Sequence, residues 1–184
     1  ETMFRYEKTG TEARITSTEG VQRKRVILGA RPCDIQAVCL IDQVFSGKEY
    51  TDVYYANKRE ATTIIGMACN HPLSTCFCTS AGGGPFLRKG SDLFLIDLGK
   101  TFLVELLTEK GMTFQKNKLL KEAGPKEISL AQEIEEKALK KTDTSVPVEG
   151  IDRRSDLMTE SPFWDRMHEK CIGCGVCTLL CPTC

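Results

Sequence analysis

Residues 171–184 read CIGCGVCTLLCPTC, and this stretch decides how the end of the chain folds. Its first three cysteines stand at successive steps of three residues, and a fourth follows four residues later, directly before a proline. This C-x2-C-x2-C-x3-C-P spacing is typical of chains that wrap a cubane iron–sulfur cluster, because three thiolates so spaced can turn inward on one tight loop. The run predicts that Cys171, Cys174 and Cys177 bind three irons of one 4Fe-4S cluster.

The fourth cysteine of the run has a different expected role. A short helix should follow the loop and end at Pro182, which would carry Cys181 away from the other three. We therefore expect Cys181 to face a second cluster. The printed sequence ends at Cys184 without a second CxxCxxC run. We expect the segment to be truncated, with the fourth ligand of the first cluster lying beyond it or supplied by Cys184.

A zinc site and a disulfide framework are the alternative uses for the ten cysteines. Zinc usually takes its cysteines as separated CxxC pairs, whereas three successive steps followed by CP form the ferredoxin pattern. Five disulfides would suit a small secreted chain, but adjacent CxxC steps make poor bridge partners, and no signal peptide is visible. The spacing favours iron–sulfur chemistry over both.

The composition is that of an ordinary globular chain, with 41% hydrophobic and 27% charged residues among 184. Its 25 Lys and Arg balance 25 Asp and Glu, which leaves no electrostatic footprint for nucleic acid or for an anionic membrane surface. No apolar run approaches the length of a membrane span. Thiols kept free for metal imply a reducing compartment, so we expect a cytoplasmic protein whose partners are other proteins.

Hydrophobic periodicity predicts a mixed α/β (α+β) domain followed by a ferredoxin-like 4Fe-4S segment. Expected strands cover residues 3–7, 12–17, 25–28, 61–68, 92–98 and 101–107, and the last two should form a hairpin joined at Gly99 and Lys100. Expected helices begin at Pro32, around Ile128 and after Pro162. The domain should span 1–141 with a cysteine-rich loop. The polar residues 142–160 should form a linker, and 161–184 the incomplete cluster segment.

A second set of cysteines lies at predicted strand exits and in the long loop that follows one of them. If the strands at 25–28 and 61–68 are parallel neighbours, their carboxyl ends meet at one sheet edge, where four thiolates would converge. Four is the number that a second cluster needs. One alternative is that these cysteines are buried free thiols that pack in the core, and the next is that they bind zinc. The candidate ligands are Cys33, Cys69, Cys76 and Cys78; Cys39, in mid-helix, is expected to pack.

The glycines of the AGGGP segment, residues 81–85, are a candidate cofactor-binding element. They lack the GxGxxG spacing and the following helix of a phosphate-binding loop, which favours a structural turn. Glycines beside a cluster also let backbone amides approach its sulfurs, so a role facing the cofactor is open for Gly82, Gly83 and Gly84. His71 and His168 have no companions at ligand spacing, and ordinary surface or packing roles are expected for both.

Taken together, several motifs resemble a known family: GARPCD (29–34), CNHPLSTCFCTSAGGGP (69–85), the DL opening of the hairpin, and FWDRMHEKCIGCGVCTLLCPTC (163–184). It is the iron–sulfur electron-transfer subunit family that includes the beta subunit of sulfhydrogenases and an iron–sulfur subunit of anaerobic sulfite reductase. The resemblance spans nearly the whole chain. It implies two clusters in the C-terminal segment and supports a further one at the second set of cysteines.

The resemblance also implies a function. Members sit between a flavin- or NAD(P)-binding subunit and a catalytic metal subunit, and relay single electrons between them without catalysing a reaction of their own. We therefore expect a non-catalytic electron-transfer subunit of an anaerobic, cytoplasmic oxidoreductase of the hydrogenase or sulfite-reductase type. An enzyme acting at the glycine-rich loop is one rival, although no positioned acid, base or nucleophile is recognisable there. A structural or redox-sensing metal-binding module is the other.

Overall fold

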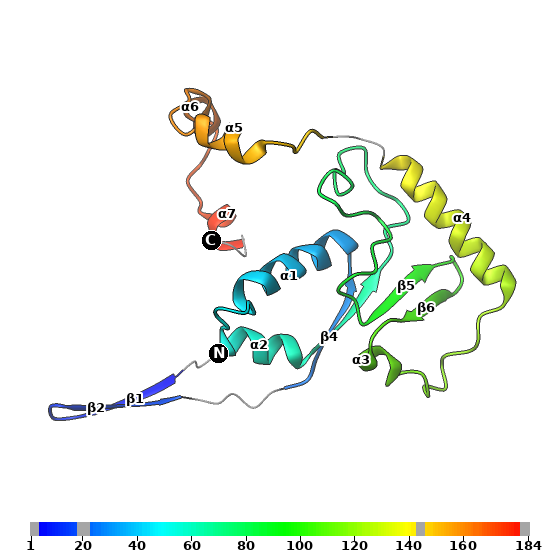
Figure 1. The fold of residues 1–184 in the computed structure, drawn as a ribbon, viewed down its shortest axis with the longest axis horizontal. Coiled ribbons are helices and arrows are strands. Elements are labelled where there is room, and N and C mark those ends of the chain that lie inside the picture. Colours follow the sequence, from blue (N-terminus) through cyan, green and yellow to red (C-terminus); the bar gives the residue numbers. More distant parts are fainter. Residues whose placement is uncertain (1–3, 18–22, 143–145, 181–184) are drawn as a thin grey trace. The chain divides into compact units, whose positions relative to one another are not determined.

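The computed structural model describes residues 4–17, 23–142 and 146–180 (Figure 1). It divides into two compact units, Glu1–Thr144 and Ser145–Cys184. Cys181 and Cys184, two of the predicted cluster residues, lie outside the described residues. The described helices include none that is both long enough and apolar enough to cross a membrane.

A four-stranded mixed sheet organises the first unit, with strand order β3-β4-β5-β6. Strands β3 (Arg25–Ala30), β4 (Thr62–Met67) and β5 (Leu93–Asp97) run parallel, and β6 (Phe102–Leu106) returns antiparallel to β5. The last two strands form the hairpin predicted from two apolar runs joined at Gly99 and Lys100. Gly99 supports its turn with φ of 94°, a left-handed value that favours glycine.

Two helices connect β3 to β4, as a parallel pair requires. Helix α1 (Pro32–Phe45) has a proline at its start and Asp34 in its first turn, and it spans the residues that apolar spacing predicts. Helix α2 (Val53–Glu60) was not predicted. Its first turn is capped by Asp52, whose side chain accepts hydrogen bonds from the backbone N–H groups of Tyr54 and Tyr55.

The hydrophobic core lies between the sheet and helix α4 (Pro125–Lys141). Phe94 and Ile96, two residues apart in β5, lie on the same face of the sheet and are almost fully buried. The helix adds two small residues at helical spacing, Ala131 and Ala138, which allow it to approach the strands closely. Phe86, in the loop before β5, completes the cluster and meets Phe94 edge to face, with ring centroids 6.4 Å apart.

The remaining elements are short. A separate hairpin of β1 (Phe4–Thr9) and β2 (Glu12–Ser17) precedes the sheet, and α3 (Glu109–Met112) follows it. In the second unit, α5 (Ile151–Leu157) forms within the segment predicted to be a linker, and α6 (Phe163–His168) and α7 (Val176–Leu180) follow. The structure is therefore a mixed α/β fold, and the second unit carries the cysteine run near its end.

Candidate metal centres

Parallel pairing of β3 and β4 brings two cysteine-bearing segments to the same edge of the sheet. Leu28 of β3 pairs with Ile65 of β4, so both strands end side by side. The chain leaves β3 through Ala30 into Cys33, in the first turn of α1, and leaves β4 through Ala68 into Cys69. Carboxyl ends of neighbouring parallel strands are a common place for ligand sites in α/β folds.

All four cysteines of the second set line one pocket at this edge, with a cavity volume of about 430 Å³. We call it the cysteine pocket: Cys33, Cys69, Cys76 and Cys78, with the residues that surround them. Its other walls are largely apolar, and include Pro32, Leu40, Phe77 and Pro85. All four thiols are free. The sequence predicted this convergence, and the structure shows the four residues around one hollow.

Hydrogen bonds hold the cysteine-rich loop against α1 and the strand ends. Gln36 of α1 donates from Nε2 to the carbonyl of Ala81 over 2.9 Å, and the N–H of Cys69 donates to Pro85 over 2.9 Å. Within the loop, the N–H of Leu73 donates to Sγ of Cys76 over 3.3 Å.

Burial affects the protonation of the metal-free thiols. Desolvation raises the pKa of the Cys33 thiol, and the nearby Asp34 carboxylate adds to this effect. Desolvation also raises the pKa of the Cys69 thiol, with Cys76 contributing, while Arg31 acts in the opposite direction. A metal must therefore displace protons from these thiols when it binds.

The three glycines of residues 81–85 have different roles. Gly84 lines the cysteine pocket, and although it is buried, a Cβ built on it would meet no atom within 4 Å. A Cβ on Gly83 would collide with the side chain of Gln36, so that glycine permits the loop to approach α1. Gly82 has φ of 72° and serves the turn itself. Cofactor binding by the three glycines stays a prediction.

The spread of the four thiols bears on which metal group they suit. Among the described residues, no three His, Cys, Asp or Glu side chains lie close enough together to hold one metal ion. A single zinc binds each sulfur at about 2.3 Å, which would crowd four thiolates to within roughly 4 Å of one another. A cubane cluster takes one thiolate at each of four separate irons. Four cysteines lining one hollow match the donor set of such a cluster, and the metal group that they hold stays a prediction.

The C-terminal cysteine run forms a glycine-supported loop that enters a helix. Gly173 and Gly175 have φ of 68° and 69°, which permits the tight path between Cys171 and the start of α7. The N–H of Gly173 donates to Sγ of Cys171 over 3.4 Å. Cys171, Cys174 and Cys177 are all exposed, free thiols. The predicted loop followed by a helix is present through Leu180.

Cys39 differs from the pocket cysteines. It is part-buried in α1, away from the strand ends, and a Cβ built on Gly90 would lie 2.5 Å from its Sγ. This close approach to the loop before β5 agrees with the packing role expected from its position in the helix.

His168 Nδ1 lies 3.2 Å from the carbonyl of Trp164, four residues earlier in the chain.

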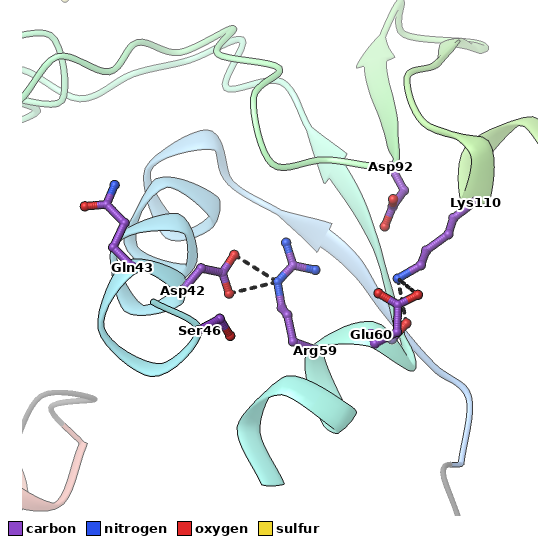
Figure 2. A pocket seen from close by; sticks show the side chains of 7 residues that line it. All are labelled: Asp42, Gln43, Ser46, Arg59, Glu60, Asp92 and Lys110. Atoms are coloured by element: carbon purple, nitrogen blue, oxygen red, sulfur yellow. Dashed lines mark hydrogen bonds and ion pairs between the residues drawn. The ribbon is translucent and has the colours of Figure 1, made fainter. Parts of the chain in front are cut away.

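A second hollow, which the sequence did not indicate, lies among α1, α2 and α3 (Figure 2). Asp42 of α1 meets Arg59 of α2, with Nε 3.1 Å from both carboxylate oxygens, and Tyr55 donates to Asp42 over 2.6 Å. Lys110 of α3 pairs with Glu60 at 3.4 Å. These two ion pairs join neighbouring elements, and the carboxylate of Asp92 in the same lining accepts hydrogen bonds from the N–H of Ile64 and the hydroxyl of Thr108. The polar contacts of this hollow are therefore structural.

Comparison with known proteins agrees with the cysteine chemistry. Residues 166–183 match the model of a 4Fe-4S binding domain. Along 184 residues the chain is 33% identical to sulfhydrogenase 2 subunit beta of Pyrococcus furiosus. The chain is a relative of this beta subunit. The resemblance expected from the sequence is confirmed, and with it a 4Fe-4S cofactor.

The extent of the match is uneven between the two proteins. It covers 99% of this chain but 53% of the relative, so the chain spans about half the length of the beta subunit. No solved structure gives a significant match to the chain.

Proposed function

We propose that this chain is a non-catalytic electron-transfer subunit. It relays single electrons between a flavin- or NAD(P)-binding subunit and a catalytic metal subunit of a cytoplasmic, multi-subunit oxidoreductase of the hydrogenase or sulfite-reductase type. The observation that carries the proposal is the convergence of four free cysteines on one pocket, in a chain that also contains a 4Fe-4S binding domain. A cluster at each of these two places would carry one electron at a time, as a relay requires.

The residues have distinct roles in this proposal. Cys33, Cys69, Cys76 and Cys78 hold one 4Fe-4S cluster at the sheet edge, and Cys171, Cys174 and Cys177 hold another. Cys181 serves a further cluster. When bound, these clusters supply one-electron redox chemistry, in contrast to the electron pairs handled by flavins and nicotinamides. The protein's part is to bind them and to shape their surroundings.

Metal analysis of cysteine variants tests the assignment. The full chain, purified without oxygen, should contain iron and acid-labile sulfide and give cubane EPR signals after reduction. Cys76→Ser and Cys174→Ala should each remove about four irons per chain, because each breaks one cluster site. Cys39→Ala is the matched control, since Cys39 is a part-buried cysteine outside the cysteine pocket. Full iron content in the Cys76 variant would reduce the pocket cysteines to core packing.

The relay itself requires partners, and the complex from the native host tests for them. Subunits that co-purify with the chain should include one that binds flavin or NAD(P) and one that holds a catalytic metal. Reduction of the clusters by a nicotinamide donor should occur in the complex and not in the isolated chain. A complex without a flavin or nicotinamide subunit would contradict the proposed path.

A structural or redox-sensing metal module is the alternative function. It is favoured by one observation, that the three described cysteines of the C-terminal run are all exposed, as oxygen-labile sensor clusters often require access. Zinc without visible absorption would support the structural form. A cluster that is lost on exposure to air and regained on repair, in a chain that binds no redox partner, would support the sensing form.

A further inference from the structure

One basic side chain stands at the cysteine pocket. Arg31 lines the pocket and is exposed, and it acts on the electrostatics of Cys69. Its backbone N–H donates to Oδ2 of Asp34 over 3.4 Å, which fixes the start of α1. Among the described residues, no carboxylate forms an ion pair with its guanidinium. The positive charge of Arg31 is therefore not cancelled by an ion pair within this part of the chain.

An opposite charge lies beside Cys33. Oδ1 of Asp34 is 3.9 Å from Sγ of Cys33, close enough for its charge to act on that sulfur. Two proposed ligands therefore have charges of opposite sign near them, Arg31 near Cys69 and Asp34 near Cys33. Both charged residues are held at the N-terminus of α1, a helix of 14 residues whose dipole adds partial positive charge at the same end.

The inference follows from charge and rests on the proposed cluster in the cysteine pocket. Reduction adds one negative charge to a cluster, and a nearby cation stabilises that charge, whereas a nearby anion destabilises it. We propose that Arg31 and Asp34 set the reduction potential of this cluster in opposite directions, Arg31 raising it and Asp34 lowering it. Both are positioning residues that act through the electric field at the pocket, and neither binds iron.

An EPR-monitored redox titration of the full chain tests the proposal. The Cys174→Ala background removes the signal of the C-terminal cluster, so the remaining signal reports on the cysteine pocket. Arg31→Gln keeps much of the side-chain length but removes the charge. At a fixed solution potential it should lower the ratio of reduced to oxidised cluster by up to about tenfold. For one electron, that is a shift of about 59 mV.

Three further variants separate charge from structure. Asp34→Asn keeps an oxygen that can accept from the N–H of Arg31, and it should raise the reduced fraction. Arg31→Lys keeps the charge and should restore most of the wild-type potential. Lys48→Gln removes an exposed cation beyond the opposite end of α1, about 21 Å along the helix, and should change little. A purely structural effect would not give opposite signs for Arg31 and Asp34.

The possible failures are distinguishable. A Cys174→Ala chain that holds no cluster overturns the proposed second centre, and this inference with it. In the second case, the pocket cluster is present in every variant, but its reduction potential in Arg31→Gln equals that of the Cys174→Ala parent. This result overturns the inference and leaves the proposed function standing. Shifts of Arg31→Gln and Asp34→Asn in the same direction would also overturn it, since a field of two opposite charges cannot produce them.

Discussion

The guanidinium of Arg88 holds the carboxylate of Glu105 in a two-point contact, with Nε 2.6 Å from Oε2 and Nη2 3.0 Å from Oε1. The same side chain bonds Glu135 of α4 and lies 5.5 Å from the ring centroid of Phe94. Hydrogen bonds from Glu105 and Glu135 raise the pKa of Arg88 further above its ordinary value. One residue from the loop before β5 thereby joins β6, α4 and the core.

Loss of this arginine should destabilise the first unit. Arg88→Gln leaves two part-buried carboxylates facing each other without a cation, and we expect the free energy of unfolding to fall by about 2 kcal/mol. Chemical denaturation monitored by circular dichroism measures the change. Lys137→Gln is the control, because Lys137 pairs with Glu133 on the exposed side of α4 and should contribute under about 0.5 kcal/mol. Equal effects of the two variants would contradict the role given to Arg88.

Tyr55 should give the first unit a measurable pH dependence. Desolvation and the hydrogen bond to Asp42 raise the pKa of Tyr55 well above its ordinary value of 10. The folded protein therefore keeps this proton at pH values where the unfolded chain releases it. It follows that the stabilisation is full below about pH 10 and decreases as pH rises above it.

Thermal unfolding between pH 8 and pH 11 measures this effect, in steps of about half a unit. Tyr55→Phe should be less stable near neutral pH but should lose less stability as the solution becomes alkaline. Tyr6→Phe is the control, because Tyr6 is 65% exposed on the β1–β2 hairpin. Parallel curves for wild type and Tyr55→Phe would show that the phenol proton is not linked to folding.

Removal of the metal should leave the first unit folded. The core around Phe94 and Ala131 lies between α4 and the sheet, and the cysteine pocket is at the strand ends beside α1. Chelation under reducing conditions should therefore bleach visible absorption while far-ultraviolet circular dichroism changes little. The loop at 69–85 should become more sensitive to proteolysis, since its thiols lose their shared partner. Unfolding of the whole first unit on chelation would show that its fold depends on the cluster.

Much of this fold could be predicted because its signals are local. The span of α1 followed from Pro32 and apolar spacing, and the β5–β6 hairpin from two apolar runs joined at Gly99 and Lys100. Helix α2 was missed because its eight residues are mostly polar and aromatic, without a clear apolar stripe. It depends on contacts with another element, above all Arg59 with Asp42, and such contacts are not visible in its own sequence.

Some features of the candidate site could also be predicted from the sequence, and others could not. Convergence of Cys33 and Cys69 could be predicted, since parallel strands bring their carboxyl ends together whatever the side chains are. The effect of the opposite charges of Arg31 and Asp34 could not be predicted, because it depends on where the start of α1 lies relative to the loop. Gly84 was singled out with its neighbours, but only the loop geometry distinguishes it as a pocket residue.

Gly111 offers a test in which local propensity and packing predict opposite outcomes. It is buried in α3, where alanine would ordinarily favour the helix by about 1 kcal/mol. A Cβ there would collide with the backbone oxygen of Asp92, which accepts the N–H of Leu107 over 2.9 Å and cannot easily move. Steric conflict in a packed site costs about 1–3 kcal/mol, so we expect Gly111→Ala to be destabilising overall.

The matched control for Gly111 is Gly84→Ala. Both glycines are buried and neither has positive φ, but a Cβ at Gly84, which lines the cysteine pocket, would meet no atom within 4 Å. In the metal-free protein, Gly84→Ala should change the free energy of unfolding little. Its main effect should be a lower iron content. If Gly111→Ala were instead more stable than wild type, helix propensity would outweigh the contact with Asp92. The packing around Asp92 would then be less tight than the hydrogen bonds that its carboxylate accepts from the Ile64 N–H and the Thr108 hydroxyl imply.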